Sequence, residues 1–138
     1  MSRNFMRWWY QRADGEYVFQ HYRVNDPASP RGKRYGYRMP MWTAEGKVKR
    51  WIYQKPADAD SLVWQLPLVL DNPDEPLVLT EGERDAEAAL RRDVLATCHH
   101  GGAGKFTKSQ ADSLAGHRGE FLLVADNDGP GAVDVCRR

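Results

Sequence analysis

The sequence predicts a mixed α/β fold, in which a small antiparallel β module precedes a short parallel sheet. One observation is composition: residues 1–70 hold 12 Lys or Arg, 6 Asp or Glu and every Trp and Tyr, whereas residues 71–138 hold 8 Lys or Arg and 13 Asp or Glu. The other is pattern, because strand–turn–strand runs give way to apolar strands that alternate with helices. The contrast indicates two modules, although an ordinary β module with an aromatic core and an Arg-rich surface would have the same composition.

Four strand-like runs make up the front half, at residues 6–12, 16–24, 34–42 and 48–54. Asp14-Gly15 between the first two runs is a compact hairpin signal, and residues 25–33 are rich in turn formers. We therefore expect an antiparallel sheet. Pro40 lacks the N–H that a central strand donates, so it predicts an edge strand or a bulge at that point.

The segment DNPDEP, residues 71–76, holds two prolines and three acids, which is typical of a boundary between modules. It follows the short apolar stretch LVWQLPLVL at residues 62–70. We expect a basic, aromatic β module over residues 1–70, a linker over 71–76 and an α/β core over 77–138.

Three apolar runs in the rear half predict strands, at residues 77–80, 94–98 and 121–125. Helical segments are expected over 82–93, from Thr107 through about Leu114, and from Ala132 onward. Thr107 and Gln110 match a capping box at the start of the second helix. Repeated strand–helix units predict a parallel sheet with right-handed crossovers, and purely apolar strands are those covered on both faces.

Acidic residues directly follow two of these strands. Glu81 follows the first strand, and Asp126 and Asp128 follow the third. Ligands of an open parallel sheet bind beyond the carboxyl ends of its strands, so these carboxylates converge if the first and third strands are neighbours. Asp85 lies one helical turn beyond Glu81 and can point the same way.

Carboxylates that crowd together need a cation, a shared proton or wide exposure to solvent. Hard oxygen ligands suit Mg²⁺ (or Mn²⁺), which can organise an in-line displacement at a phosphodiester, while a spare glutamate moves the proton of a hydroxyl. Each acid taken alone is explained as a solvated loop residue or as an acid favoured by a helix N-terminus. Only their joint placement predicts a metal site.

Two segments of the rear half resemble the signatures of the Toprim domain: EGERDAEAAL, residues 81–90, and VADNDGPG, residues 124–131. GGAGKF, residues 101–106, resembles the primase-like Toprim proteins of phages and mobile elements, and the front half is similar to the region that precedes Toprim in them. The resemblance implies a short parallel Toprim (Rossmann-like) sheet. Toprim domains continue past the third helix into another strand, so the core would be incomplete at Arg138.

By this resemblance Glu81 would be the acid/base glutamate. Asp126 and Asp128 would hold Mg²⁺, with Glu81 as a further ligand and with support from Asp85. The implied function is Mg-dependent, DNA-primase-type nucleotidyl transfer on single-stranded DNA or RNA/DNA, with nucleotides as substrates and a replication helicase or polymerase as a further partner. A Toprim nuclease, or a non-catalytic nucleic-acid-binding or protein-interaction module, would share these features.

Composition also bears on location. No apolar run approaches the length of a membrane helix, the N-terminus has no secretory pattern, and the two cysteines suit a reducing compartment. We expect a cytoplasmic protein with no membrane contact.

Two further groups are candidates for contacts with phosphate or nucleic acid: the glycine-rich turn with Gly102, Gly104 and Lys105, and the basic loop with Arg31, Lys33 and Arg34. The glycine-rich turn does not match a P-loop, because His99 and Phe106 stand where glycine and Ser or Thr are required. A tight strand-to-helix turn and a solvated basic surface are the plain alternatives.

Cys98, His99, His100 and Cys136 lack the paired spacing of zinc ligands. We expect Cys98 to be buried in a strand and the two histidines to be exposed in the turn.

The front half also offers aromatic side chains that could stack on bases, namely Trp8, Trp9, Tyr37, Trp42 and Trp51. Strand alternation directs about half of such side chains into the core, and the sequence does not say which half.

Overall fold

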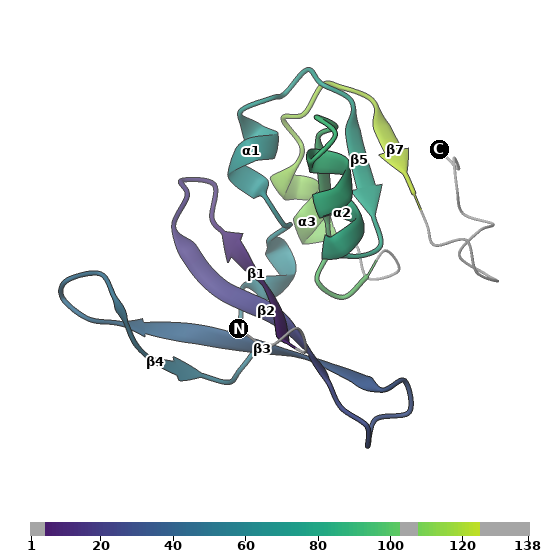
Figure 1. Cartoon of the computed structure of the whole chain (residues 1–138). Helices are drawn as coiled ribbons and strands as arrows, with labels where there is room; N and C mark the ends of the chain where they lie inside the picture. The colour runs from purple at the N-terminus through teal and green to yellow at the C-terminus, as the bar shows by residue number, and fades with distance from the viewer. Residues whose placement is uncertain (1–4, 103–107, 125–138) are drawn as a thin grey trace.

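The computed structural model describes residues 5–102 and 108–124. It has an antiparallel four-stranded sheet and a separate parallel three-stranded sheet, so the mixed α/β class is confirmed (Figure 1). The elements in chain order are β1 (Phe5–Gln11), β2 (Tyr17–Asn25), β3 (Lys33–Trp42), β4 (Val48–Ile52), the 3₁₀ helix η1 (Ala59–Ser61), α1 (Leu66–Leu70), β5 (Leu77–Thr80), α2 (Glu83–Leu90), β6 (Ala96–Cys98), α3 (Lys108–Ser113) and β7 (Phe121–Leu123).

The antiparallel sheet has the strand order β1-β2-β3-β4. The predicted hairpin turn is present between β1 and β2, where Gly15 adopts a φ of 94° that suits glycine. Alternation along β1 buries Trp8 and Tyr10 and directs Trp9 to the opposite face. One face of this sheet therefore packs against the rest of the chain.

Pro40 lies where β3 has a single neighbour. The pairing of β3 with β2 ends at Arg38, and Pro40 pairs only with Trp51 of β4. A register shift follows at Met41 and Trp42. The missing N–H of proline thus falls at a local edge beside a bulge, as expected.

The parallel sheet has the order β6-β5-β7, which places the first strand of the rear half beside the third. Val78 of β5 pairs with Leu122 of β7, and the Val124 N–H donates to the Leu79 carbonyl at 2.9 Å. The two strands whose ends carry the predicted acids are therefore neighbours, which is the condition under which those acids would converge. Asp126 and Asp128, the helix expected from Ala132, and the end of the 121–125 run lie outside the described residues.

The stretch at 62–70 contributes a short helix, α1, that the sequence pattern did not predict. Pro67 stands in its first turn, where a missing N–H costs nothing. Trp64, Leu66 and Val69 are buried, and the Trp64 N–H donates to the Cys98 carbonyl at 3.1 Å. This segment therefore ties the antiparallel sheet to β6.

One hydrophobic core extends through both halves of the chain. Tyr10 and Phe19 from the antiparallel sheet belong to the same buried cluster as Val63, Leu77 and Ala86. Figure 1 shows α2 and α3 beside the parallel strands, and the β3–β4 hairpin reaching away from the helices. Within residues 5–102 and 108–124, no helix has the length and apolar character needed to cross a membrane.

Candidate functional site

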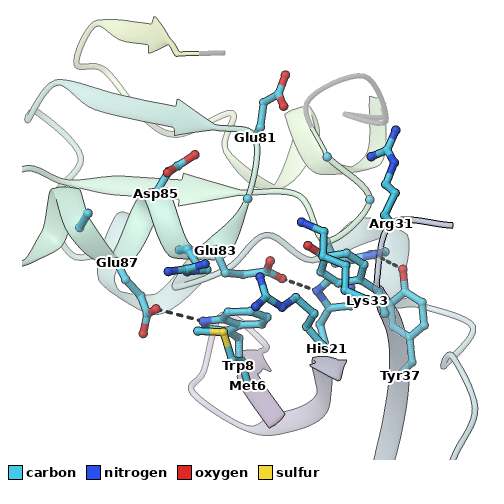
Figure 2. Close-up of a pocket in the computed structure, with 18 of the residues that line it drawn as sticks. Met6, Trp8, His21, Arg31, Lys33, Tyr37, Glu81, Glu83, Asp85 and Glu87 are labelled. Atoms are coloured by element: carbon cyan, nitrogen blue, oxygen red, sulfur yellow. Dashed lines mark hydrogen bonds and ion pairs between the residues drawn. The ribbon is translucent and has the colours of Figure 1, made fainter. Parts of the chain in front are cut away.

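A cleft of about 1040 Å³ lies between the antiparallel sheet and the carboxyl end of β5 (Figure 2). Five residues selected from the sequence line it: Arg31, Lys33, Glu81, Asp85 and Gly102. They come from segments up to about 70 residues apart and meet in one place. Four other sequence-selected residues, Gly104, Lys105, Asp126 and Asp128, lie outside the described residues.

The acidic wall of the cleft is the junction between β5 and α2. Glu81 directly follows β5, and the extended backbone of Gly82 leads into the helix. The Thr80 hydroxyl donates to the Gly82 carbonyl at 2.8 Å and fixes this junction. Asp85 stands in the first turn of α2, where the partial positive charge of the helix terminus favours a carboxylate.

The four acids of this junction divide between two directions. Figure 2 shows Glu83 and Glu87 joined by hydrogen bonds to His21 and Trp8 of the antiparallel sheet, with Glu81 and Asp85 on the other side of the chain. Glu83 and Glu87 point the same way because residues four apart on a helix share a face. Glu81, which precedes the helix, and Asp85 line the cleft on the side away from His21 and Trp8.

The basic wall is the connection between β2 and β3. Arg31 is exposed and Lys33 is partly buried, and both line the cleft. The loop has its own hydrogen bonds, because the Ser29 hydroxyl donates to the Lys33 carbonyl at 2.7 Å and the Ala28 N–H donates to the Asp26 carboxylate at 3.0 Å. These bonds stabilise the loop that brings the two cations to the cleft.

Arg34 does not join the other two basic residues of this loop. Its guanidinium lies 3.4 Å from the Asp26 carboxylate, and the residue is not among those that line the cleft. Alternation along β3 explains the difference, since Lys33 and Arg34 point to opposite faces of the strand.

Beneath the cleft lies a buried polar group that the sequence did not indicate. The Tyr10 hydroxyl donates to Glu83 Oε2 at 2.8 Å, and the same oxygen lies 2.5 Å from His21 Nδ1. Glu83 and His21 are each 4% exposed, and the Trp8 indole N–H donates to the Glu87 carboxylate at 3.1 Å. The sequence pattern indicates this group only in part. Alternation places His21 on the same face of β2 as the core residue Phe19, and helical spacing places Glu83 and Glu87 on one face of α2.

Burial controls the ionisation of the groups beside this pair. It raises the pKa of the Tyr10 hydroxyl well above its usual value, and Cys98 and Glu83 add to the effect. Burial and the negative charge of Glu83 raise the pKa of the Cys98 thiol in the same way. Cys98 is therefore a buried thiol, as expected, and not a reactive thiolate.

The expectation that His99 and His100 are exposed is wrong, because both are buried at the end of β6. His100 Nδ1 lies 2.8 Å from the Tyr37 hydroxyl, and its Nε2 lies 3.0 Å from the Ala59 carbonyl oxygen. The Gly101 N–H donates to His99 Nδ1 at 2.8 Å. These contacts with η1 and β3 enclose a turn that would otherwise face solvent.

Asp60, His99 and His100 form a cluster that could hold a metal ion, since their ligand atoms lie within 4.8 Å of one another. Burial, followed by the neighbouring His100, lowers the pKa of His99 to about 4, and burial lowers the pKa of His100, so both rings are neutral at pH 7. An ion there would replace the Lys55–Asp60 ion pair of 2.8 Å. Imidazole nitrogens suit Zn²⁺ and related ions rather than Mg²⁺, so this cluster differs in kind from the expected magnesium site.

Comparison with known proteins adds no assignment: no protein-family model, no curated protein and no solved structure matches this chain. The Toprim resemblance stays a prediction from residues 81–90 and 124–131. Functional inference therefore depends on the cleft itself.

Proposed function

We propose that this protein is a primase-like Toprim protein that binds nucleic acid in the cleft and carries out Mg²⁺-dependent chemistry at phosphodiester bonds. The observation that carries the proposal is that two acids of the β5–α2 junction, Glu81 and Asp85, and two cations of the β2–β3 connection, Arg31 and Lys33, line one cleft. Acids of this kind hold a divalent ion, and cations of this kind hold phosphate groups.

The acidic residues are chemically suited to Mg²⁺. Glu81 and Asp85 offer oxygen donors at the carboxyl end of β5, and β7 ends beside β5 at the same edge of the sheet. Mg²⁺ binds through few carboxylates and keeps several waters. Glu81 and Asp85, with Asp126 and Asp128 from the segment after β7, are the residues proposed to hold it. The bound ion would supply neutralisation of charge on the reacting phosphate.

The chain's own residues have separate roles in this proposal. Arg31 and Lys33 orient the phosphate backbone by charge, and Glu81 accepts the proton of the attacking hydroxyl. Tyr35, which is 49% exposed and lines the cleft, offers a ring on which a base can stack.

The first test is calorimetric titration of Mg²⁺ into the wild type, Glu81→Gln and Asp85→Asn. Glu45→Gln is the matched control, because Glu45 is an exposed carboxylate in the β3–β4 turn. The proposal predicts weaker Mg²⁺ binding in both cleft variants and in the Asp126→Ala/Asp128→Ala variant, and unchanged binding in the control. Isotherms that match the wild type in all of the cleft variants would refute the metal site.

The second test separates the reactions that a Toprim site supports. Primer synthesis and nicking are assayed on single-stranded DNA with Mg²⁺ and with Mn²⁺. Primer synthesis that Glu81→Gln abolishes supports the primase-like function, and Glu81-dependent nicking alone replaces it with a nuclease. Mg²⁺ binding with neither reaction leaves a non-catalytic binding module.

A further inference from the structure

We infer that the face of the antiparallel sheet that points away from the cleft is a second binding surface, and that its ligand is single-stranded nucleic acid. The surface consists of Trp9, Tyr17, Trp42 and Trp51 with Arg38, and is called the outer aromatic face below. The inference goes beyond the proposed function, which concerns only the cleft, and it needs neither metal nor catalysis.

Strand alternation separates the two surfaces. On β1, Trp8 lines the cleft, and Trp9 points the other way. On β3, Tyr37 lines the cleft, and Arg38 contacts Trp51 on the opposite side. The structure thus divides the aromatic residues that the sequence left undivided: Trp8 and Tyr37 face inward, and Trp9, Trp42 and Trp51 face outward.

The outward rings form one connected group. The Trp9 ring lies 6.1 Å from that of Trp42, nearly parallel at 13°, and 5.6 Å from that of Trp51. It also lies 4.9 Å from the ring of Tyr17. Trp42 and Tyr17 are 46% and 48% exposed, although large apolar rings are usually covered in a folded chain. These exposed rings provide flat surfaces on which a base can stack.

Arg38 packs under the Trp51 ring and restrains it. Its guanidinium lies 3.9 Å from the centroid of the Trp51 ring, and its Nε donates to the Gln20 side chain at 2.8 Å. Arg38 is buried, so these contacts are not exchanged for water. The Trp51 ring is therefore ordered before any ligand arrives, which lowers the entropy cost of binding.

Charge complementarity selects a polyanion as the occupant. Strands β1 to β4 contain no Asp or Glu, and the basic residues that alternation places on this face are Arg7, Arg34, Arg38 and Lys49. Arg7, Arg34 and Lys49 are exposed. Basic strands with exposed aromatic rings are typical of single-strand binding. Duplex bases already stack on one another, so the rings favour unpaired strands.

The test is fluorescence anisotropy with a labelled oligothymidylate in EDTA, together with quenching of tryptophan fluorescence. Trp42→Ala is expected to weaken binding about ten-fold and to reduce the quenching, and Trp42→Phe to retain most of the affinity. Met41→Ala is the matched control, because Met41 is a 40% exposed apolar side chain next to Trp42 on β3 that has no ring on which a base can stack. Thermal unfolding of each variant checks that the fold is kept.

Each outcome decides the inference. Loss of affinity in Trp42→Ala but not in Met41→Ala supports it, whether or not the cleft has activity. Equal affinity of Trp42→Ala and wild type, or equal competition by duplex DNA of the same length, overturns it. Sedimentation that shows a dimer abolished by Trp42→Ala also overturns it, because a second copy of the chain would then cover this face.

Discussion

Glu83 Oε2 lies 2.5 Å from His21 Nδ1, and this contact joins the first turn of α2 to the middle of β2 across 62 residues of sequence. The Tyr10 hydroxyl donates to the same oxygen from β1. The three side chains are buried, so each polar atom depends on the others in place of water. The two walls of the cleft are thereby joined through one carboxylate.

Glu83→Gln is expected to lower the free energy of unfolding by about 2 kcal/mol, because it replaces the buried carboxylate that contacts Tyr10 and His21 while keeping the side-chain volume. Tyr10→Phe removes one hydrogen bond and is expected to cost about 1 kcal/mol. Urea unfolding measures both values. Glu45→Gln, an exposed change, is the control, and a Glu83→Gln midpoint equal to that of the control would contradict the structural role.

Stability is expected to fall as the pH drops from 6.5 to 4. His99 has a pKa of about 4 in the folded chain and about 6.5 when unfolded, so the unfolded state binds the proton first. The contribution of His99 to the free energy of unfolding, about 3 kcal/mol, is fully present above pH 6.5 and is lost below pH 4. Urea unfolding as a function of pH measures it. His99→Gln should remove this part of the pH dependence, and a variant with the same slope as the wild type would show that His99 does not cause it.

Arg31→Glu/Lys33→Glu is expected to weaken binding of single-stranded DNA and to flatten its salt dependence. Loss of two phosphate contacts lowers the slope of log K against log salt by about 1.4. Anisotropy at several salt concentrations measures the slope, in the Trp42→Ala background so that the cleft is observed without the outer aromatic face. Arg34→Glu is the control, since Arg34 pairs with Asp26 outside the cleft. Equal slopes in both variants would assign the effect to net charge alone.

Gly119→Ala is expected to lower the free energy of unfolding by about 2 kcal/mol, because a Cβ there would collide with the backbone carbonyl of Glu75. The Gly119 N–H donates to the Pro73 carbonyl at 3.1 Å, so this close approach fixes the segment that leads into β7. Gly116→Ala is the matched control, since a Cβ at Gly116 meets no atom within 4 Å. Thermal unfolding compares the two, and equal midpoints would rule out the close approach.

The order of strands and helices could be predicted because it depends on local pattern. Apolar runs, Asp14-Gly15 and Pro40 all act within a few residues, and the structure has the expected hairpin, local edge and parallel sheet. The strand order that makes β5 and β7 neighbours is only a condition at the sequence level, because local pattern does not fix which parallel strands lie side by side.

The buried polar contacts could not be predicted in the same way. His21 contacts Glu83, 62 residues later in the sequence, and Tyr37 contacts His100, 63 residues later. Hydrophobic periodicity does not indicate contacts between residues so far apart in the sequence. Histidines next to two glycines have the pattern of an exposed turn, and only the packing of η1 and β3 over them encloses them. The sequence likewise could not say which aromatic residues of a strand face outward, since that depends on where the second layer lies.

The carboxylate of Glu83 also limits how the cleft can respond to a ligand. Tyr10 of β1 and His21 of β2 both contact this carboxylate at the start of α2. Separation of the sheet from α2 would therefore leave a buried ionisable group without either contact. Movement of the antiparallel sheet away from α2 is therefore disfavoured, and the width of the cleft is fixed. We expect the cleft to select substrates by their thickness and by whether they can enter from its open side.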